Sequence, residues 1–309
     1  MNSTACCHSK AEAREGGQSF VLKVAQGLIY PISNLWSEES NQGQRTRRLC
    51  IFVGWQLWKR IVRKPITVSL FNGKRFIAHP DCQVSSGVLY TRIPNSRNIL
   101  FLRKHLSGGT LIDVGANVGS VSLLLADTIE DAILFEPNPV AAARARENLA
   151  RNELGFKVYE LALSDTNGEI RFACHGGVDV GGHVLVNAPS PAATRVVPCI
   201  TFDEFLRRHG DPALPVSLVK IDVEGHENSV LRGMRQFLAE RRPPLVMFEY
   251  LQRTNLEETL RFFAGVGYQV FGVGTNGPIA VTSRAEPLQD LFACPVERMA
   301  AMGVAGITS

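Results

Sequence analysis

From Thr110 to about Thr282 the chain alternates short apolar runs with longer segments that are apolar on one face only. Short apolar runs between turn residues predict buried strands, and apolar residues repeating every three to four positions predict helices. The expected strands are Leu111–Val114, Ala132–Phe135, Lys157–Leu161, Glu169–Ala173, Arg195–Ile200, Val216–Val223, Leu245–Tyr250, Gln269–Val273 and Ile279–Thr282. This alternation predicts an α/β fold, a doubly wound and mostly parallel sheet with helices on both faces.

The chain before Thr110 has a different pattern. Residues 1–18 are polar and we expect them to be disordered, whereas 49–64 carries an apolar stripe with basic flanks and predicts an amphipathic helix. Ile66–Leu70 and Arg75–Ala78 flank an Asn-Gly pair, which suits the tight turn of a β-hairpin. The expected parts are an N-terminal extension (1–64), a hairpin and lead-in (65–109), the main domain (110–284) and a C-terminal tail (285–309).

Charge is placed unevenly along a chain that is otherwise of ordinary soluble composition, with 45% hydrophobic and 20% charged residues. The net charge is +4, yet the stretch from Ser40 to Pro80 holds nine basic residues and no acidic one. The basic helix could lie on an anionic membrane surface or touch nucleic acid. We favour a helix packed against the main domain with a solvated basic rim, and expect no nucleic-acid partner, because Trp55 and Trp58 also suit a core.

Seven cysteines are scattered along the chain without a CxxC pair. An odd, unpatterned set argues against a disulfide framework and against a zinc site, and favours a reducing compartment. No apolar run of about 18 residues and no signal-peptide pattern is visible. The expected location is the cytoplasm.

The segment with the clearest chemistry is Leu-Ile-Asp-Val-Gly-Ala-Asn-Val-Gly at 111–119, followed by Glu136 at the end of the next apolar run. A strand, a tight turn and a helix start bring bare backbone amides against a ligand. An acid at the end of the second strand can accept hydrogen bonds from both hydroxyls of a ribose. These residues predict a ribose-bearing cofactor.

Glycine spacing separates two classes of such cofactor. A dinucleotide fingerprint needs glycines at i, i+2 and i+5, but Asn117 and Ser120 occupy the second and third of those places after Gly115. Asn tolerates a left-handed backbone, so Asn117 can still make the turn, although its side chain would crowd a pyrophosphate. Asp113 would also repel phosphate but could organise amides around a cationic amino-acid group. S-adenosylmethionine therefore fits the turn better than NAD.

Polar residues stand at the carboxyl ends of the apolar strands, which is the edge where α/β sheets bind ligands. This set is Asp113, Glu136, Ser164, Asp165, Asp222 and Glu249. In the segment that follows Asp222, His226 has an intrinsic pKa suited to removing a proton from a hydroxyl, but it could equally cap the next helix. The catalytic candidates are therefore Asp222, His226 and Glu249. Oxygen ligands for a divalent ion are present, but without a second His or a paired Asp at ligand spacing no metal site is expected.

Four motifs in this order resemble the FkbM-type methyltransferases: Asp-Val-Gly-Ala-Asn-Val-Gly (113–119), Phe-Glu-Pro-Asn-Pro (135–139), Ala-Leu-Ser-Asp (162–165) and Lys-Ile-Asp-Val-Glu-Gly-His-Glu (220–227). The resemblance covers roughly Tyr90 to Gly274, and the last motif is the most specific. It implies a class I, Rossmann-like fold with a seven-stranded sheet and S-adenosylmethionine as cofactor. Ser120 departs from the family, where many members have an aromatic residue.

The resemblance also implies roles for the matching residues. Asp113, Gly115, Asn117 and Gly119 would form the turn on the methionine side, and Glu136 would bind the ribose. Ser164 and Asp165 would flank the adenine, and Asp222 would face the transferred methyl group.

The expected reaction is O-methylation of a hydroxyl on a small metabolite, a sugar or a polyketide-like substrate. The alternatives are an NAD(P)-dependent reductase, which the glycine spacing disfavours, and a non-catalytic scaffold that keeps the cofactor fold and binds a membrane surface through the basic helix.

Overall fold

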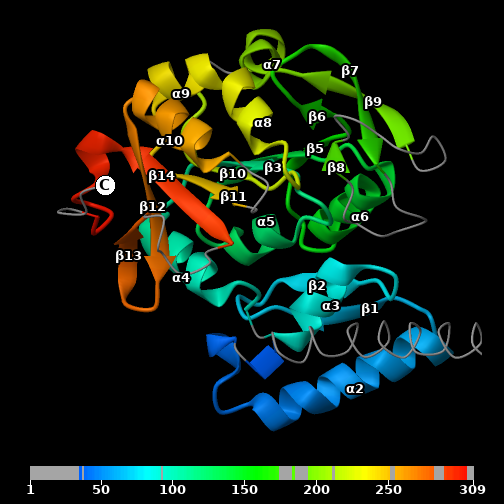
Figure 1. Cartoon of the computed structure of the whole chain (residues 1–309). Helices are drawn as coiled ribbons and strands as arrows, with labels where there is room; N and C mark the ends of the chain where they lie inside the picture. The colour runs from blue at the N-terminus through cyan, green and yellow to red at the C-terminus, as the bar shows by residue number, and fades with distance from the viewer. Residues whose placement is uncertain are drawn as a thin grey trace, which may run out of the picture.

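A computed structural model describes residues 35–36, 38–91, 93–173, 183–184, 194–210, 213–250, 255–281 and 289–304 (Figure 1). The expected disordered start (1–18) lies outside these residues, and so does the Gly-rich stretch Gly176–Pro191 apart from residues 183–184.

The main sheet has eight strands in the order β13-β12-β14-β11-β10-β3-β4-β5. Five neighbouring strands are parallel: β11 (Val246–Glu249), β10 (Val216–Ile221), β3 (Thr110–Val114), β4 (Asp131–Phe135) and β5 (Lys157–Tyr159). The other three pair antiparallel: β14 (Asp290–Pro295), β12 (Tyr268–Gly274) and β13 (Gly277–Ala280). The α/β class is confirmed, but the sheet has one strand more than the seven expected.

Strand β14 corrects the expected domain boundary. Residues 285–309 were assigned to a C-terminal tail, yet β14 lies between β11 and β12 and all six of its residues are buried. The run Asp-Leu-Phe-Ala-Cys-Pro is itself a short apolar run of the kind that predicts a strand. What no local pattern shows is its place in the middle of the sheet, because its partners are far away in sequence. The main domain therefore extends at least to Pro295.

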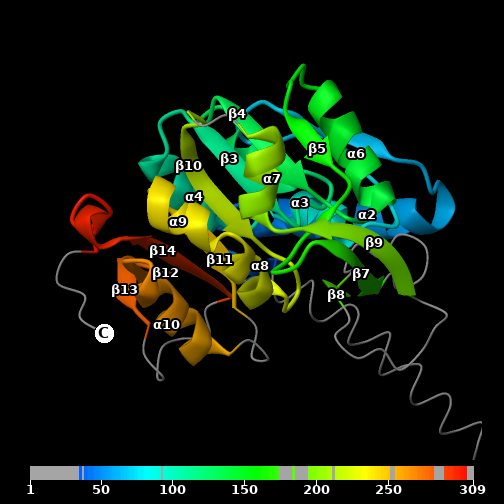
Figure 2. The same cartoon turned by 90° about the horizontal axis from the view of Figure 1, so that it is seen from above.

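Helices cover both faces of the main sheet, as a doubly wound fold requires (Figures 1 and 2). Successive residues of β3 alternate between two cores, with Leu111 in one and Ile112 in the other. Helices α4 (Ser96–His105), α5 (Ser120–Leu125) and α6 (Pro139–Ala150) contribute to the first core, together with two helices of the N-terminal part. Those of the second core are α7 (Phe202–His209), α8 (Glu227–Gly233), α9 (Arg235–Arg241) and α10 (Leu256–Gly265).

A second, four-stranded sheet stands beside the main one. Its order is β6 (Ala162–Leu163), β9 (Thr194–Ile200), β7 (Gly168–Ala173) and β8 (His183–Val184). Two strands expected in the central series, Glu169–Ala173 and Arg195–Ile200, pair antiparallel with each other here. This sheet forms one wall of the cavity described below.

The N-terminal part contributes α2 (Arg45–Ile61), the hairpin β1 (Ile66–Ser69) and β2 (Arg75–Ala78), and α3 (Gln83–Tyr90). The expected hairpin is confirmed, with Ile66 opposite Ala78. Trp55 is buried, and its indole N–H donates to Ser86 Oγ at 3.0 Å. Short 3-10 helices η1 (Glu39–Asn41) and η3 (Val296–Arg298) complete the described elements. No helix among the described residues is long and apolar enough to cross a membrane.

Gly233, the last residue of α8, packs tightly against the backbone at Ser164, which follows strand β6 of the second sheet. A Cβ atom there would lie 1.9 Å from the carbonyl oxygen of Ser164, and backbone cannot yield as the end of a side chain can. Gly54, in the middle of α2, has nothing within 4 Å of the same atom. The two helical glycines therefore form a matched pair.

We predict that Gly233→Ala lowers the free energy of unfolding by about 1–3 kcal/mol, because the backbones of α8 and residue 164 must separate. Gly54→Ala should leave it unchanged or raise it by up to about 1 kcal/mol, since Ala favours helix more than Gly. Urea unfolding followed by circular dichroism measures both values. Equal effects of the two substitutions would contradict the packing described for Gly233.

Candidate functional site

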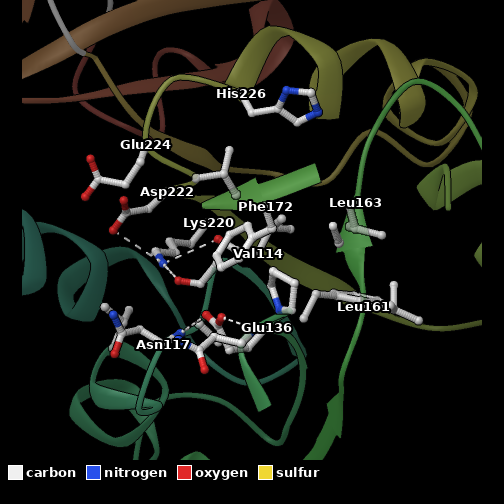
Figure 3. Close-up of a pocket in the computed structure, with 18 of the residues that line it drawn as sticks. Val114, Asn117, Glu136, Leu161, Leu163, Phe172, Lys220, Asp222, Glu224 and His226 are labelled. Carbon is white, nitrogen blue, oxygen red and sulfur yellow. Dashed lines mark hydrogen bonds and ion pairs between the residues drawn. The ribbon is translucent and has the colours of Figure 1, made fainter. Parts of the chain in front are cut away.

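A cavity of about 180 Å³ opens at the carboxyl edge of β3, β4 and β10 (Figure 3). Its walls are the turns that follow these three strands, at 115–117, 136–138 and 222–226, and an apolar surface of the second sheet. The site thus lies at the edge where the sequence places its polar strand ends. Of the predicted residues, Gly115, Asn117, Glu136, Asp222 and His226 line the cavity.

The turn after β3 requires both of its unusual residues. Gly115 has φ +71°, and a Cβ atom there would lie 1.8 Å from the carbonyl oxygen of Asp222, so only glycine fits. Asn117 has φ +53°, which confirms the left-handed backbone expected for it. Gly119 has φ +75° and precedes the first residue of α5, behind the cavity wall.

Glu136 joins two turns through its carboxylate. Its Oε2 accepts a hydrogen bond from the backbone amide of Asn117, and its Oε1 accepts one from that of Asn138, each at 2.8 Å. Burial raises the pKa of Glu136 to about 7, although the two amides and Lys220 favour the ionised form. The side chain is held rigidly at the cavity, and its charge changes near neutral pH.

A buried lysine, Lys220, holds the ends of β3 and β10 together. Its ammonium group donates to the carbonyl oxygen of Gly115 at 2.8 Å and pairs with Asp113 at 3.2 Å and Asp222 at 3.5 Å. Burial lowers its pKa, but the two carboxylates outweigh this, so the net shift is upward and Lys220 is charged. We did not predict this role. The signal was present, because a lysine in an apolar strand is buried and must be paired.

Asp113 lies beneath the cavity and does not line it. It is fully buried, accepts a hydrogen bond from Ser122 Oγ at 2.7 Å, and pairs with Lys220. Asp113 was expected to form the cofactor turn on the methionine side. In the structure its side chain does not reach the cavity and instead pairs with Lys220 beneath it.

The Ser164–Asp165 pair and His226 form a separate polar group. Ser164 Oγ lies 2.9 Å from His226 Nε2 and donates to Asp165, and Asp165 pairs with Arg232 at 2.9 Å. Neither Ser164 nor Asp165 lines the cavity, where the neighbouring wall consists of Leu161, Leu163 and Phe172. These three apolar residues were not predicted.

His226 points away from the carboxylates on the other side of the cavity (Figure 3). Burial lowers its pKa, while Asp165 opposes the shift, so its ring is neutral at pH 7. Its side chain makes no capping hydrogen bond to α8. Glu227 shapes this turn instead, because its carboxylate accepts from the amides of Val223 and Gly225.

Three carboxylates gather beside the cavity, and we call Asp222, Glu224 and Glu249 the acidic cluster. One oxygen from each lies within 4.8 Å of the others. The Asp222 side chain is 43% exposed, whereas Glu249 at the end of β11 is only 7% exposed. Burial, together with repulsion from Asp222 and other acids, raises the pKa of Glu249 to about 8. The structure thus brings Asp222 and Glu249 together but leaves His226 apart from them.

The sequence and the fold of this chain are both similar to those of known methyltransferases. Residues 113–270 match the methyltransferase FkbM domain. The hexuronic acid methyltransferase AglP of Haloferax volcanii is 32% identical over 139 residues, which cover 45% of this chain and 55% of AglP. The 2-O-methyltransferase NoeI of Sinorhizobium fredii is 29% identical over 153 residues, which cover 43% of this chain and 60% of NoeI. The matched region thus spans somewhat more than half of these relatives.

Among solved structures, this chain resembles a tRNA (uracil-54, C5)-methyltransferase of Pyrococcus abyssi in complex with S-adenosyl-L-homocysteine. The two are 12% identical with a TM-score of 0.42, over 74% of this chain and 44% of that one. A SAM-dependent methyltransferase of Agrobacterium tumefaciens gives the same identity and TM-score, over 74% of this chain and 69% of that one.

The domain match covers just over half of the chain and begins at Asp113, the first residue of the motifs that suggested the resemblance. The chain belongs to the FkbM methyltransferase family.

Proposed function

We propose that this protein transfers a methyl group from S-adenosylmethionine to a hydroxyl of a sugar or sugar-like molecule. The observation that carries the proposal is the cavity itself, which runs from the buried carboxylate of Glu136 to the exposed carboxylate of Asp222. In a member of this family, the Glu136 end would hold the ribose of S-adenosylmethionine, and the Asp222 end would face its positively charged sulfonium group.

The residues that line the cavity fit S-adenosylmethionine. Glu136 would accept hydrogen bonds from the ribose hydroxyls, as acids at the end of the second strand do. The apolar wall of Leu161, Leu163 and Phe172 would cover the adenine ring. Gly115 leaves room for close approach of the backbone, and Asp222 offers a negative charge to the cationic end.

Charge also argues against the alternative NAD(P) cofactor. When bound, S-adenosylmethionine supplies a methyl group on a positively charged sulfur, whereas a dinucleotide would bring two phosphate charges to the same edge. Asp222 and Glu224 line the cavity there, and Lys220 is already paired with two carboxylates. The negative charges of Asp222 and Glu224 would repel the negatively charged pyrophosphate of a dinucleotide.

We predict that Glu136→Gln raises the dissociation constant for S-adenosylhomocysteine about tenfold or more, since hydrogen bonds to a charged group contribute about 1.5–3 kcal/mol each. The affinity of the unmodified protein should increase as pH rises through about 7, because ionised Glu136 is the better acceptor. The variant should lose that dependence. Isothermal titration at several pH values measures both effects.

Glu257→Gln is the matched control, because this side chain is 80% exposed on α10 and does not line the cavity. Its titrations should match those of the unmodified protein. A folded Glu136→Gln variant with unchanged affinity would refute the ribose site.

The acceptor hydroxyl is assigned to the Asp222 side of the cavity. Methyl transfer to a hydroxyl releases a proton, and a carboxylate within reach can orient the hydroxyl and take that proton up. Asp222 is exposed in the cavity with Glu249 behind it, whereas His226 is hydrogen-bonded to Ser164 on the opposite side. We therefore assign the chemistry to Asp222 and a positioning role on the wall to His226.

The acceptor class rests on the two curated relatives and on charge. AglP is named for hexuronic acid and NoeI for 2-O-methylation, and both names fit a sugar hydroxyl as acceptor. The acidic cluster would repel the carboxylate of a hexuronic acid. A neutral glycoside is therefore the better acceptor for this chain in the absence of a bound cation.

We predict that Asp222→Asn lowers kcat by about 10²–10⁴-fold, the range for loss of proton transfer. His226→Ala should change mainly the KM for S-adenosylmethionine and leave kcat within about tenfold, because His226 shapes the wall of the cavity and takes up no proton. The assay uses labelled donor with a panel of neutral glycosides and hexuronates. A kcat loss of 10²-fold in His226→Ala with normal turnover in Asp222→Asn would reverse the assignment.

The exposed face of α2 supports a second proposal, a weak contact with an anionic membrane surface. Val53, Leu57 and Ile61 recur every fourth residue and are 50%, 53% and 76% exposed. Residues at this spacing form one stripe of a helix, while Phe52 and Trp55 on another side are buried. Basic residues flank the stripe throughout 45–64. An apolar stripe with basic flanks is the pattern of a helix that lies in a lipid interface.

We predict that the protein sediments with vesicles containing phosphatidylglycerol and not with pure phosphatidylcholine vesicles, and that about 0.5 M NaCl weakens the association because salt screens the charges. The double substitution Leu57→Glu with Ile61→Glu should abolish binding. Leu100→Glu on α4 is the control, with a similarly exposed leucine outside the stripe. Absence of vesicle binding would refute this contact, and binding without any methyl transfer would favour the scaffold alternative.

A further inference from the structure

We propose that the acidic cluster binds a divalent cation. Asp222 and Glu224 come from the turn after β10, and Glu249 ends the neighbouring strand β11. Their nearest carboxylate oxygens all lie within 4.8 Å of one another. Oxygens that coordinate one hard cation at about 2.1–2.5 Å are separated by comparable distances.

The three carboxylates of the cluster lie close together, and Asp222 shares its lysine with a second acid. Lys220 reaches it through Asp222 at 3.5 Å, but the same ammonium is closer to Asp113 at 3.2 Å. Three carboxylates drawn together repel one another strongly in a partly buried setting. A divalent cation at their centre would reverse that repulsion.

A second observation points to a ligand at the same place. Glu249 is nine-tenths buried, and its Oε2 atom has no hydrogen-bond partner within the described structure. Asp290, a buried acid on the adjacent strand β14, shows the usual arrangement, because Asn95 and Asn98 both donate to it. A buried carboxylate oxygen without a partner is costly. Coordination of a cation would satisfy it.

The donor set indicates the kind of ion. All three ligands are carboxylates, and no described His or Cys belongs to the cluster. Oxygen-only sites favour Mg²⁺, Mn²⁺ and Ca²⁺ over Zn²⁺ and Cu²⁺. Asp222 is 43% exposed, so water or a substrate oxygen can complete the coordination sphere.

Sequence spacing gave no reason to expect a metal, because Glu249 is far from Asp222 and Glu224 along the chain. The pairing of β11 with β10 brings it beside them. The consequence for catalysis rests on the proposed function: a cation here would orient acceptor hydroxyls beside the cavity and make them more acidic. It would also allow an anionic acceptor such as a hexuronate to approach the acidic cluster.

Binding is tested on the full chain after treatment with a chelator and its removal, without cofactor or acceptor. Titration with Mn²⁺, followed by the electron paramagnetic resonance signal of the free ion, should show about one site per chain that Mg²⁺ displaces. Glu249→Gln and Glu224→Gln should each weaken Mn²⁺ binding at least tenfold, while Glu257→Gln should not. Thermal unfolding confirms that each variant is folded.

Two results would overturn the proposal: no Mn²⁺ binding at millimolar concentration, or binding that both cluster variants retain unchanged. The outcome is separable from that of the proposed function. Mn²⁺ binding lost in the variants supports the site even if no methyl transfer is found. Methyl transfer that proceeds unchanged in a chelator, with no bound Mn²⁺, refutes the cation site and leaves the transferase.

Discussion

The buried ammonium of Lys220 is the interaction on which the site depends. An ammonium group is stable inside a protein only when oxygens replace its hydration, and here the Gly115 carbonyl oxygen, Asp113 and Asp222 do so. The group therefore fixes the carboxyl ends of β3 and β10 relative to each other. At the same place, the pairing of β3 with β10 brings Gly115 close to the Asp222 backbone. Without Lys220, the buried carboxylate of Asp113 would keep its hydrogen bond from Ser122 but lose its counter-charge.

The charge distribution around the cavity favours cationic ligands over anionic ones. The ammonium of Lys220 is already paired with Asp113 and Asp222. The acidic cluster beside the cavity combines the part-exposed Asp222 with the buried Glu249. A sulfonium donor and a divalent ion both complement such an edge, whereas a pyrophosphate does not. The opposite wall is apolar and ends at Glu136, whose carboxylate is already oriented by two backbone amides. The cavity therefore has an apolar wall that ends at Glu136 on one side and the acidic cluster on the other.

The sequence predicted those parts of the site that are set locally. The left-handed Asn117, the strand-end Glu136 and the Asn138 cap of α6 each depend on neighbours within a few residues or on one βα unit. Parts that depend on distant pairing were missed. β14 enters the middle of the sheet from the far end of the chain. Asp222 and Glu249 were both expected at the catalytic edge, but the acidic cluster that they form with Glu224, which depends on the pairing of β11 with β10, was not. Asp113 was expected at the ligand because its position at the end of β3 is right, but its side chain points to Lys220.

The most direct test of the account is a crystal structure of the protein with S-adenosylhomocysteine. It should show both ribose hydroxyls within about 2.6–3.0 Å of the Glu136 carboxylate. The adenine should lie against Leu161, Leu163 and Phe172, and the sulfur should face the Asp222 side of the cavity. A ligand bound at another edge of the sheet, or a ribose that makes no contact with Glu136, would contradict the assignment of this cavity as the methyl-donor site.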